Sequence, residues 1–242
     1  MENISIKNFV FDVDDTLYDH LLPFQKSVEA YFPKVDCHSI SDIYRRFRYW
    51  SDVAFPDYMS SNITIEELRI FRCKNTMIEF GVSEVTDEEA FVFQKDYEKQ
   101  LNHIILFPEV KLLLEKLTEQ NIPIAIITNS PVTHQMRKLE QLGALQYFNR
   151  ENIIISQGVG FQKPQKEIFN LASERFRFVP NKTLYIGDTF ENDIEGSYQA
   201  GWKSAWFNHR QRQAPAGQEN LPNFEIHTPE ELNSLITKLI SH

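Results

Sequence analysis

Short apolar runs alternate with helical segments along the second half of the chain, and this alternation limits the fold more than any other feature. The runs are rich in β-branched or aromatic residues, as buried strands are, and Pro and Gly punctuate the segments between them as they punctuate helices. The expected strands are residues 8–13, 122–128, 153–156, 183–187 and 204–207, and the expected helices are residues 108–120, 132–142, 165–176, 193–200 and 229–240. Strands that alternate with helices predict a parallel sheet with right-handed crossovers.

A long block with helical spacing and almost no strand-like runs separates the first expected strand from the others. It covers residues 21–103 and includes spacings such as Ile43, Phe47 and Trp50. We therefore expect an α/β protein with a doubly wound, Rossmann-like parallel sheet and an inserted all-helical domain. The expected domains are a core of residues 1–18 and 104–242 and an insert of residues 19–103.

Composition narrows the possible partners. The 242 residues include 25 Lys plus Arg and 34 Asp plus Glu, a formal charge of −9, and 42% are hydrophobic, which is typical of a globular protein. An acidic chain gains little from counterion release, so a nucleic acid polymer is not an expected partner. The longest apolar stretch, residues 123–127, is far below the roughly 20 residues of a membrane span. With a polar N-terminus and only Cys37 and Cys73, the chain is expected to be cytoplasmic.

Polar side chains stand where the expected strands end. Ligands of open parallel sheets bind outside the carboxyl ends of the strands, so these side chains should share one site. Oxygen ligands suit Mg²⁺, and an ammonium suits a phosphoryl group. The candidates are Asp12 and Asp14 after the first strand, Thr128 and Asn129 at the second, Lys163 before the fourth, and Asp188 and Asp193 after it.

The spacing of Asp12 and Asp14 requires a turn, because residues i and i+2 of an extended strand point to opposite faces. One carboxylate could then act as a nucleophile and the other as a general acid. Taken alone, the pair also fits an ordinary turn or helix cap. Asp188 and Asp193 favour the functional interpretation, since carboxylates packed together are costly unless a cation neutralises them.

Four motifs resemble those of the haloacid dehalogenase superfamily, in the same order along the chain. They are DVDDT at residues 12–16, TNS at 128–130, QKPQKEIF at 162–169 and GDTFENDIEGSYQAG at 187–201. Members of this superfamily are mostly magnesium-dependent phosphatases with a helical cap after the first strand. The resemblance implies that Asp12 is the nucleophile of an aspartyl-phosphate mechanism and that Asp14 protonates the leaving alcohol and then activates water.

The same resemblance implies a set of binding residues. Thr128 and Lys163 would hold the phosphoryl oxygens, with the Asn129 side chain nearby as a further substrate contact. The cofactor would be Mg²⁺, and its ligands would be the carboxylates of Asp12 and Asp188 and the backbone carbonyl of Asp14, with Asp193 supporting them from behind.

One position departs from the usual motif. Many relatives have Gly directly after the second Asp, whereas this chain has Asp15, a change that is not expected to abolish activity. Asp14 argues against the reaction that gave the superfamily its name, because a halide leaving group needs no acid.

Residues 206–215, WFNHRQRQAP, are similar to a segment of bacterial pyrimidine 5′-nucleotidases in this superfamily and of related sugar-phosphate phosphatases. The expected function is therefore hydrolysis of a small phosphorylated metabolite, with nucleoside 5′-monophosphates as the leading substrates. The alternatives are a phosphatase of sugar phosphates or other metabolites, a phosphomutase, and a binding module without turnover. The pattern leaves the oligomeric state open.

Two groups of residues near these motifs have ordinary structural interpretations. The loop of residues 208–223 carries His209, Arg210 and Arg212, which could help to attract an anion, but its polar composition favours solvated side chains. Tyr18 and His20 follow the first motif and are candidates for the entrance of the site, although an isolated His or Tyr at such a place is more often structural.

Overall fold

The computed structural model describes residues 5–241, and the chain divides into two compact units. The first takes the chain up to Asp19 and from Ile105 onward, and the second is His20–Ile104. Each unit has its own hydrophobic core and is described by itself.

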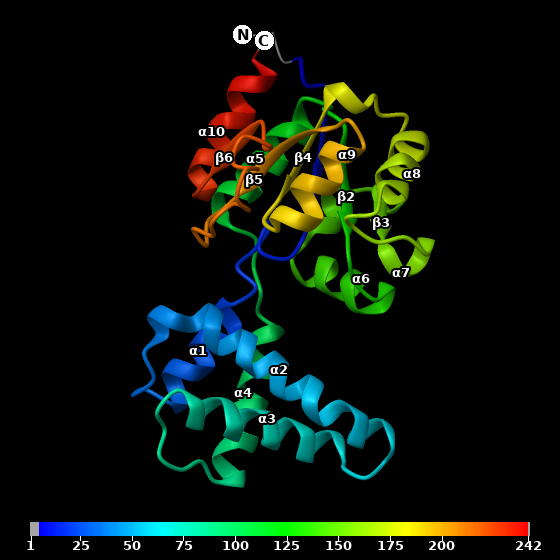
Figure 1. The fold of residues 1–242 in the computed structure, drawn as a ribbon. Coiled ribbons are helices and arrows are strands. Elements are labelled where there is room, and N and C mark those ends of the chain that lie inside the picture. Colours follow the sequence, from blue (N-terminus) through cyan, green and yellow to red (C-terminus); the bar gives the residue numbers. More distant parts are fainter. Residues whose placement is uncertain (1–4, 242) are drawn as a thin grey trace. The chain divides into compact units, whose positions relative to one another are not determined.

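A six-stranded parallel sheet forms the centre of the first unit (Figure 1). The strand order is β3-β2-β1-β4-β5-β6, so the order reverses at β1, where Phe9 pairs with Ile124 on one side and Leu184 on the other. This is the predicted doubly wound arrangement, and it places the ends of β1, β2 and β4 next to one another. The strands are β1 (Asn8–Phe11), β2 (Ile124–Thr128), β3 (Ile153–Ile155), β4 (Thr183–Gly187), β5 (Lys203–Phe207) and β6 (Phe224–Ile226).

Helices cover the sheet, whose strands are almost wholly buried. On one face, α8 contributes Ile168 and Phe169 to a core cluster that includes Val10 of β1 and Tyr185 of β4. Helices α5 and α10 pack against each other (Figure 1). The helices of this unit are α5 (Pro108–Glu119), α6 (Val132–Gln141), α7 (Ser156–Val159), α8 (Lys166–Phe176), α9 (Gly196–Gln199) and α10 (Pro229–Ile240), and a π-helical turn, Phe190–Glu195, precedes α9.

The structure differs from the sequence expectations in several places, and Ser156, expected at the end of a strand, is the first residue of α7. Strand β1 ends at Phe11 rather than at residue 13, because the chain turns there and the amides of Thr16 and Leu17 bond to the Val13 carbonyl. The π-helical turn begins before residue 193, where a helix was expected to start. Strand β6 was not expected, and its three residues pair with β5 beyond the predicted surface loop.

The second unit is all-helical, as predicted. It comprises α1 (Leu22–Tyr31), α2 (Ile40–Met59), α3 (Ile65–Glu79) and α4 (Asp87–Leu101). Capping boxes begin two of them, since Thr64 and Thr86 each exchange hydrogen bonds with the Glu three residues later. Aromatic rings fill the core, where Phe24 lies 4.8 Å from Phe47 and 5.8 Å from Phe93 between ring centroids.

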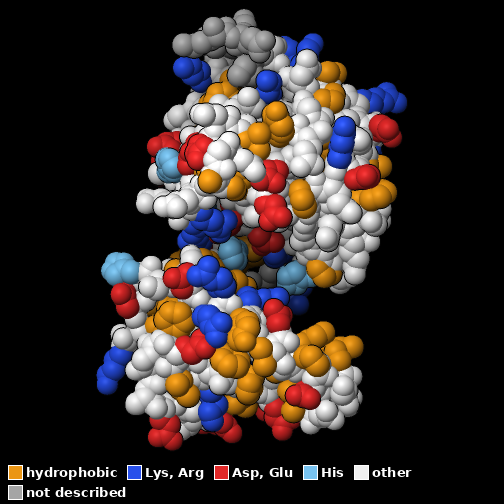
Figure 2. Space-filling model, in the orientation of Figure 1, with side chains coloured by type: hydrophobic (Ala, Val, Ile, Leu, Met, Phe, Trp, Pro, Cys, Tyr) orange, Lys and Arg blue, Asp and Glu red, His pale blue; other side chains and the backbone are white. Residues whose placement is uncertain are grey.

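Large apolar side chains also reach the surface of this unit, where Figure 2 shows orange patches. Those of α2 and α3 are Tyr49, Val53, Phe55, Met59, Ile65, Phe71 and Ile78. Among the described residues, no helix is both long and apolar enough to cross a bilayer.

Candidate active site

Three strand ends of the first unit bring the predicted site residues together. Asp12 follows β1, Asp188 follows β4, and Thr128 is the last residue of β2. All three side chains are buried. Their proximity follows from the strand order, because β1 lies between β2 and β4 and parallel strands end at the same edge.

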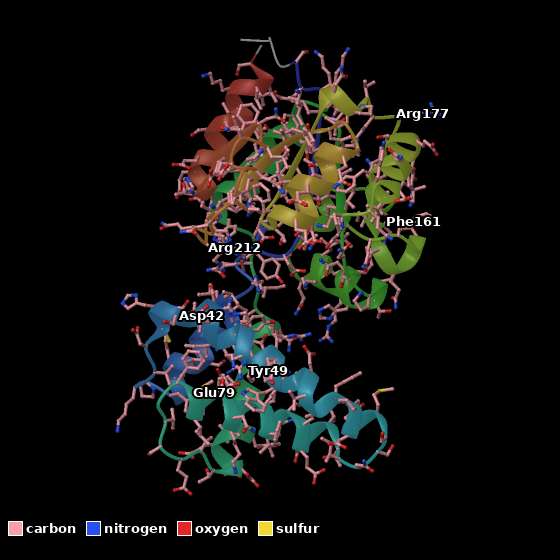
Figure 3. The ribbon with its side chains drawn as sticks, in the orientation of Figure 1. Asp42, Tyr49, Glu79, Phe161, Arg177 and Arg212 are labelled. Carbon is pink, nitrogen blue, oxygen red and sulfur yellow. The ribbon has the colours of Figure 1, made fainter. Side chains whose placement is uncertain are left out.

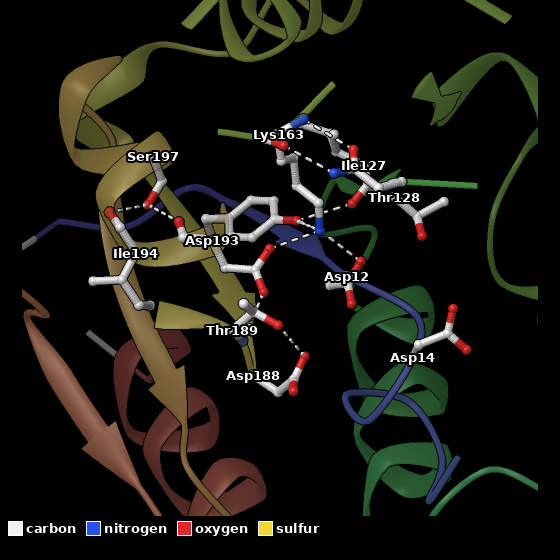
Figure 4. A network of polar contacts seen from close by, with 12 residues as sticks. Asp12, Asp14, Ile127, Thr128, Lys163, Asp188, Thr189, Asp193, Ile194 and Ser197 are labelled. Atoms are coloured by element: carbon white, nitrogen blue, oxygen red, sulfur yellow. Dashed lines mark hydrogen bonds and ion pairs between the residues drawn. The ribbon is translucent and has the colours of Figure 1, made fainter. Parts of the chain in front are cut away.

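Lys163 lies at the centre of a buried polar network (Figure 4). Its Nζ donates to Asp12 Oδ1 at 2.7 Å, to Asp193 Oδ1 at 2.6 Å and to the Tyr185 hydroxyl at 3.0 Å. The Lys163 side chain is only 4% exposed, so these contacts replace its hydration.

Tyr185 is a member of this network that the sequence analysis missed. It stands inside β4, and its hydroxyl accepts from Lys163 and donates to the backbone carbonyl of Ile127 at 2.9 Å. Nothing in the sequence distinguishes it from an apolar strand residue.

Burial and neighbouring charges shift the pKa of several groups here. Burial raises the pKa of Asp12 to about 7; Lys163 opposes the shift, while Asp193 and Asp188 add to it. Burial also raises the pKa of Asp188 to about 6, with Asp193 and Asp15 adding to the shift. Burial alone would lower the pKa of Lys163, but Asp12 and Asp193 outweigh it and hold that pKa well above its ordinary value.

Asp193 reaches the site from the π-helical turn. Its Oδ2 accepts the backbone N–H of Thr189 at 2.9 Å and its Oδ1 accepts from Lys163. This position requires a glycine in β4, because a Cβ on Gly187 would lie 2.4 Å from Asp193 Cγ.

Asp14 lies apart from the Lys163 network, and its carboxylate points away from it (Figure 4). Its Oδ1 accepts from the Tyr18 hydroxyl and from Lys138 Nζ, each at 2.5 Å. Gln135 Nε2 lies 3.4 Å from Asp14 Oδ2 and donates to Thr128 Oγ1 at 3.1 Å. Helix α6 thus supplies Gln135 and Lys138, neither of which the sequence analysis identified.

Asn129 holds the backbone of Lys163. Its Oδ1 accepts the Lys163 N–H and its Nδ2 donates to the Lys163 carbonyl, both at 2.9 Å. These two bonds tie the end of β2 to the segment before α8 and orient the lysine. The predicted contact of Asn129 with substrate remains a prediction.

The expectation that the residues after β5 carry solvated side chains was wrong for His209 and Arg210. Arg210 donates to both carboxylate oxygens of Asp15, and His209 Nε2 lies 3.4 Å from Asp15 Oδ1. Arg212, labelled in Figure 3, is 43% exposed and lies 2.8 Å from Asp188 Oδ2. Polar composition predicts a loop, but it does not show that buried carboxylates elsewhere in the chain need these cations.

The carboxylates form a donor set that suits a hard divalent cation. Asp12, Asp188 and Asp193 each offer one oxygen, and the three atoms lie within 4.8 Å of one another. All three residues are buried, and their crowding contributes to the raised pKa values of Asp12 and Asp188. A bound cation would relieve this repulsion.

The fold and this donor set define a class of α/β proteins with a doubly wound parallel sheet and an acidic centre at its strand ends, and comparison with known proteins identifies the family. Residues 6–201 match the haloacid dehalogenase-like hydrolase family. The chain therefore belongs to this family, as the motifs predicted, and it is an enzyme of the hydrolase class.

Relatives of known name align along almost the whole chain. The pyrimidine 5′-nucleotidase YjjG of Escherichia coli is 28% identical, over 94% of this chain and 96% of its own length. The glyceraldehyde 3-phosphate phosphatase of Methanopyrus kandleri is 26% identical, over 97% and 98% respectively. A crystal structure of the Bacillus subtilis HAD-hydrolase YfnB bound to magnesium has a TM-score of 0.63 and 26% identity, over 96% of this chain and 98% of that one.

Proposed function

We propose that this enzyme is a magnesium-dependent phosphomonoester hydrolase that works through an aspartyl-phosphate, with nucleoside 5′-monophosphates as its substrates. The observation that carries the proposal is the position of Asp12. Its buried carboxylate adjoins an ammonium, two further carboxylates and the end of β2. A carboxylate nucleophile beside a cation site is what transfer of a phosphoryl dianion requires.

In the first step, Asp12 attacks phosphorus and the ester P–O bond breaks, while Asp14 gives a proton to the departing alcohol. In the second step, water attacks the phosphorus, the bond from phosphorus to Asp12 breaks, and Asp14 takes the proton from water. Tyr18 and Lys138 hold the Asp14 carboxylate for both transfers.

The phosphoryl oxygens would be held by Lys163 and by the hydroxyl of Thr128. Gln135 donates to Thr128 Oγ1, which leaves the hydroxyl hydrogen of Thr128 to donate to a phosphoryl oxygen. Lys163 can contribute one N–H if it exchanges one of its three present partners.

The Mg²⁺ ligands would be the Asp12 and Asp188 carboxylates and the Asp14 carbonyl. Asp193 would support them from behind, where its Oδ1 accepts from Lys163 and its Oδ2 accepts from the Thr189 N–H. When bound, the cation would neutralise charge between the nucleophile and the phosphoryl oxygens.

Two kinds of relative support two substrate classes. Nucleotidase YjjG and the segment at residues 206–215 favour nucleoside monophosphates. The glyceraldehyde 3-phosphate phosphatase, which aligns over the same length, favours a sugar phosphate as the second candidate.

The test is phosphate release from a panel of nucleoside monophosphates, sugar phosphates and p-nitrophenyl phosphate, with Mg²⁺ and with a chelator. We expect Mg²⁺-dependent release with the highest kcat/KM for a nucleotide. Asp12→Asn should reduce the rate by at least about 1,000-fold, because an amide cannot serve as the nucleophile.

The matched control is Asp42→Asn, which alters an exposed carboxylate on α2 and should leave the rate unchanged. Full activity of Asp12→Asn would refute the assignment of Asp12 as the nucleophile. If a sugar phosphate has the highest kcat/KM, sugar phosphates replace nucleoside monophosphates as the proposed substrate class.

A further inference from the structure

Asp15 has an unusual backbone for its residue type. Its φ is +56°, in the left-handed region that glycine adopts most easily, and its side chain is 1% exposed. A residue with a Cβ costs roughly 1–2 kcal/mol in this conformation, although Asp tolerates it better than most. The turn after β1 therefore carries a strained residue with a buried charge at a position that Gly could occupy without strain.

Arg210 compensates for that charge. Its Nε donates to Asp15 Oδ2 at 3.0 Å and its Nη2 donates to Asp15 Oδ1 at 2.8 Å, and it also pairs with Asp19. A guanidinium that binds both oxygens of a carboxylate fixes the direction of that group as well as its charge. Arg212 adds a weaker contact, with Nη2 3.8 Å from Asp15 Oδ2.

The direction of Asp15 matters because of the residue before it. The Asp14 carbonyl and the Asp15 N–H belong to one planar peptide group, so anchoring Asp15 restricts the orientation of that carbonyl. The Asp14 carboxylate is held from the other side by Tyr18 and Lys138. Asp14 thus stands between two anchors, and Arg210 forms the second through Asp15.

The geometry points to Arg210 as a positioning residue. By binding both carboxylate oxygens of Asp15, it holds the Asp14 carbonyl and carboxylate in the orientation that the reaction requires. This inference rests on the proposed function, in which Asp14 is both the acid and a metal ligand. Arg210 touches neither the phosphoryl group nor the metal in this role. A carboxylate in place of the usual glycine gives the turn an attachment point that glycine lacks.

The test compares Arg210→Gln, Asp15→Gly and the double variant with the wild type. Arg210→Gln should reduce kcat for a nucleotide, whose alcohol leaving group needs the acid, by at least tenfold more than for p-nitrophenyl phosphate. In the Asp15→Gly background, Arg210→Gln should have no further effect on this ratio, because the carboxylate that Arg210 binds is absent.

Two more variants separate orientation from charge and from general damage. Arg210→Lys keeps the charge but does not bind both carboxylate oxygens, so it should unfold at a higher temperature than Arg210→Gln while showing the same leaving-group ratio as Arg210→Gln. Arg150→Gln, which removes an exposed ion pair to Glu140, is the matched control and should change neither.

Calorimetric titration with Mg²⁺ gives a readout that does not depend on turnover. We expect affinity at least about tenfold weaker in Arg210→Gln, because the proposed carbonyl ligand loses its support. Equal rate losses on both esters together with unchanged Mg²⁺ affinity would overturn the inference. Wild-type protein that binds Mg²⁺ but releases no phosphate would refute the proposed function instead, and the calorimetric comparison would still decide the role of Arg210.

Discussion

The ammonium group of Lys163 has three donors and three oxygen partners, so its hydrogen-bonding capacity is fully used. Two of the partners are carboxylates, and the third is the neutral hydroxyl of Tyr185. A buried cation in this position is held by geometry as well as by charge, since the three acceptors come from the residue after β1, from β4 and from the π-helical turn. Tyr185 is the partner whose removal changes no formal charge.

We expect Tyr185→Phe to lower the free energy of unfolding by about 1–3 kcal/mol, because Lys163 Nζ and the Ile127 carbonyl each lose a buried partner. Urea denaturation followed by circular dichroism measures it. The matched control is Tyr147→Phe, which removes a hydroxyl bonded to Glu115 nearer the surface and should cost less. Equal losses of unfolding free energy in the two variants would show that the buried Tyr185 hydroxyl stabilises the protein no more than a hydroxyl nearer the surface.

At the scale of an element, the π-helical turn Phe190–Glu195 brings Asp193 back against the end of β4. The turn is held by bonds between Thr189 and Asp193 in both directions, since the Asp193 N–H donates to the Thr189 carbonyl and the Thr189 N–H donates to Asp193 Oδ2. π-Helical turns often occur at functional sites. The close approach depends on the missing side chain of Gly187.

Gly187→Ala should therefore force Asp193 away from Lys163, because the new Cβ would stand 2.4 Å from Asp193 Cγ. We expect a loss of about 1–3 kcal/mol in unfolding free energy and a lower phosphatase rate. Thermal unfolding and the phosphate-release assay measure the two effects.

Gly158→Ala is the control, since its Cβ would meet only Val132 Cγ2, at 3.2 Å. A Gly187→Ala variant as stable and active as this control would show that the π-helical turn tolerates displacement.

The parts of the site that the sequence predicts are those attached to strand ends. Asp12, Thr128 and Asp188 follow from the fold class, because parallel strands end at one edge and the motifs mark those ends. Arg210 and Lys138 could not be predicted from spacing, since each meets its carboxylate across more than 120 residues of chain. Strand β6 was missed for another reason: its sequence FEI includes a charged residue, whereas the equally short β3 is the apolar run III.

At the scale of the whole molecule, the site buries carboxylates whose charged forms are disfavoured by burial and by one another. Asp12 and Asp188 have pKa values raised to about 7 and about 6 from an ordinary 3.8. Between about pH 4 and pH 7 the folded protein therefore retains protons that the unfolded chain has released. Stability from these two groups is present at low pH and is lost as the pH rises through their folded values.

Without metal, the melting temperature of Asp12→Asn relative to wild type should rise from pH 4 to pH 7, because the amide does not ionise. Mg²⁺ should stabilise the wild type most above pH 7, where the carboxylates are charged. Scanning fluorimetry with a chelator and with Mg²⁺ measures both effects, and Asp42→Asn is the control. A pH-independent difference between wild type and Asp12→Asn would contradict the raised pKa of Asp12.

The contact between the segments that enter and leave the helical unit affects how the chain closes its loops. The Phe107 N–H donates to the Leu17 carbonyl at 2.9 Å, so the two ends of the insertion are tied together within the first unit. The entropy lost on closing a loop grows only with the logarithm of its length, and each doubling costs about 0.6 kcal/mol. An insertion as long as His20–Ile104 therefore costs the sheet only slightly more loop-closure entropy than an insertion of half that length.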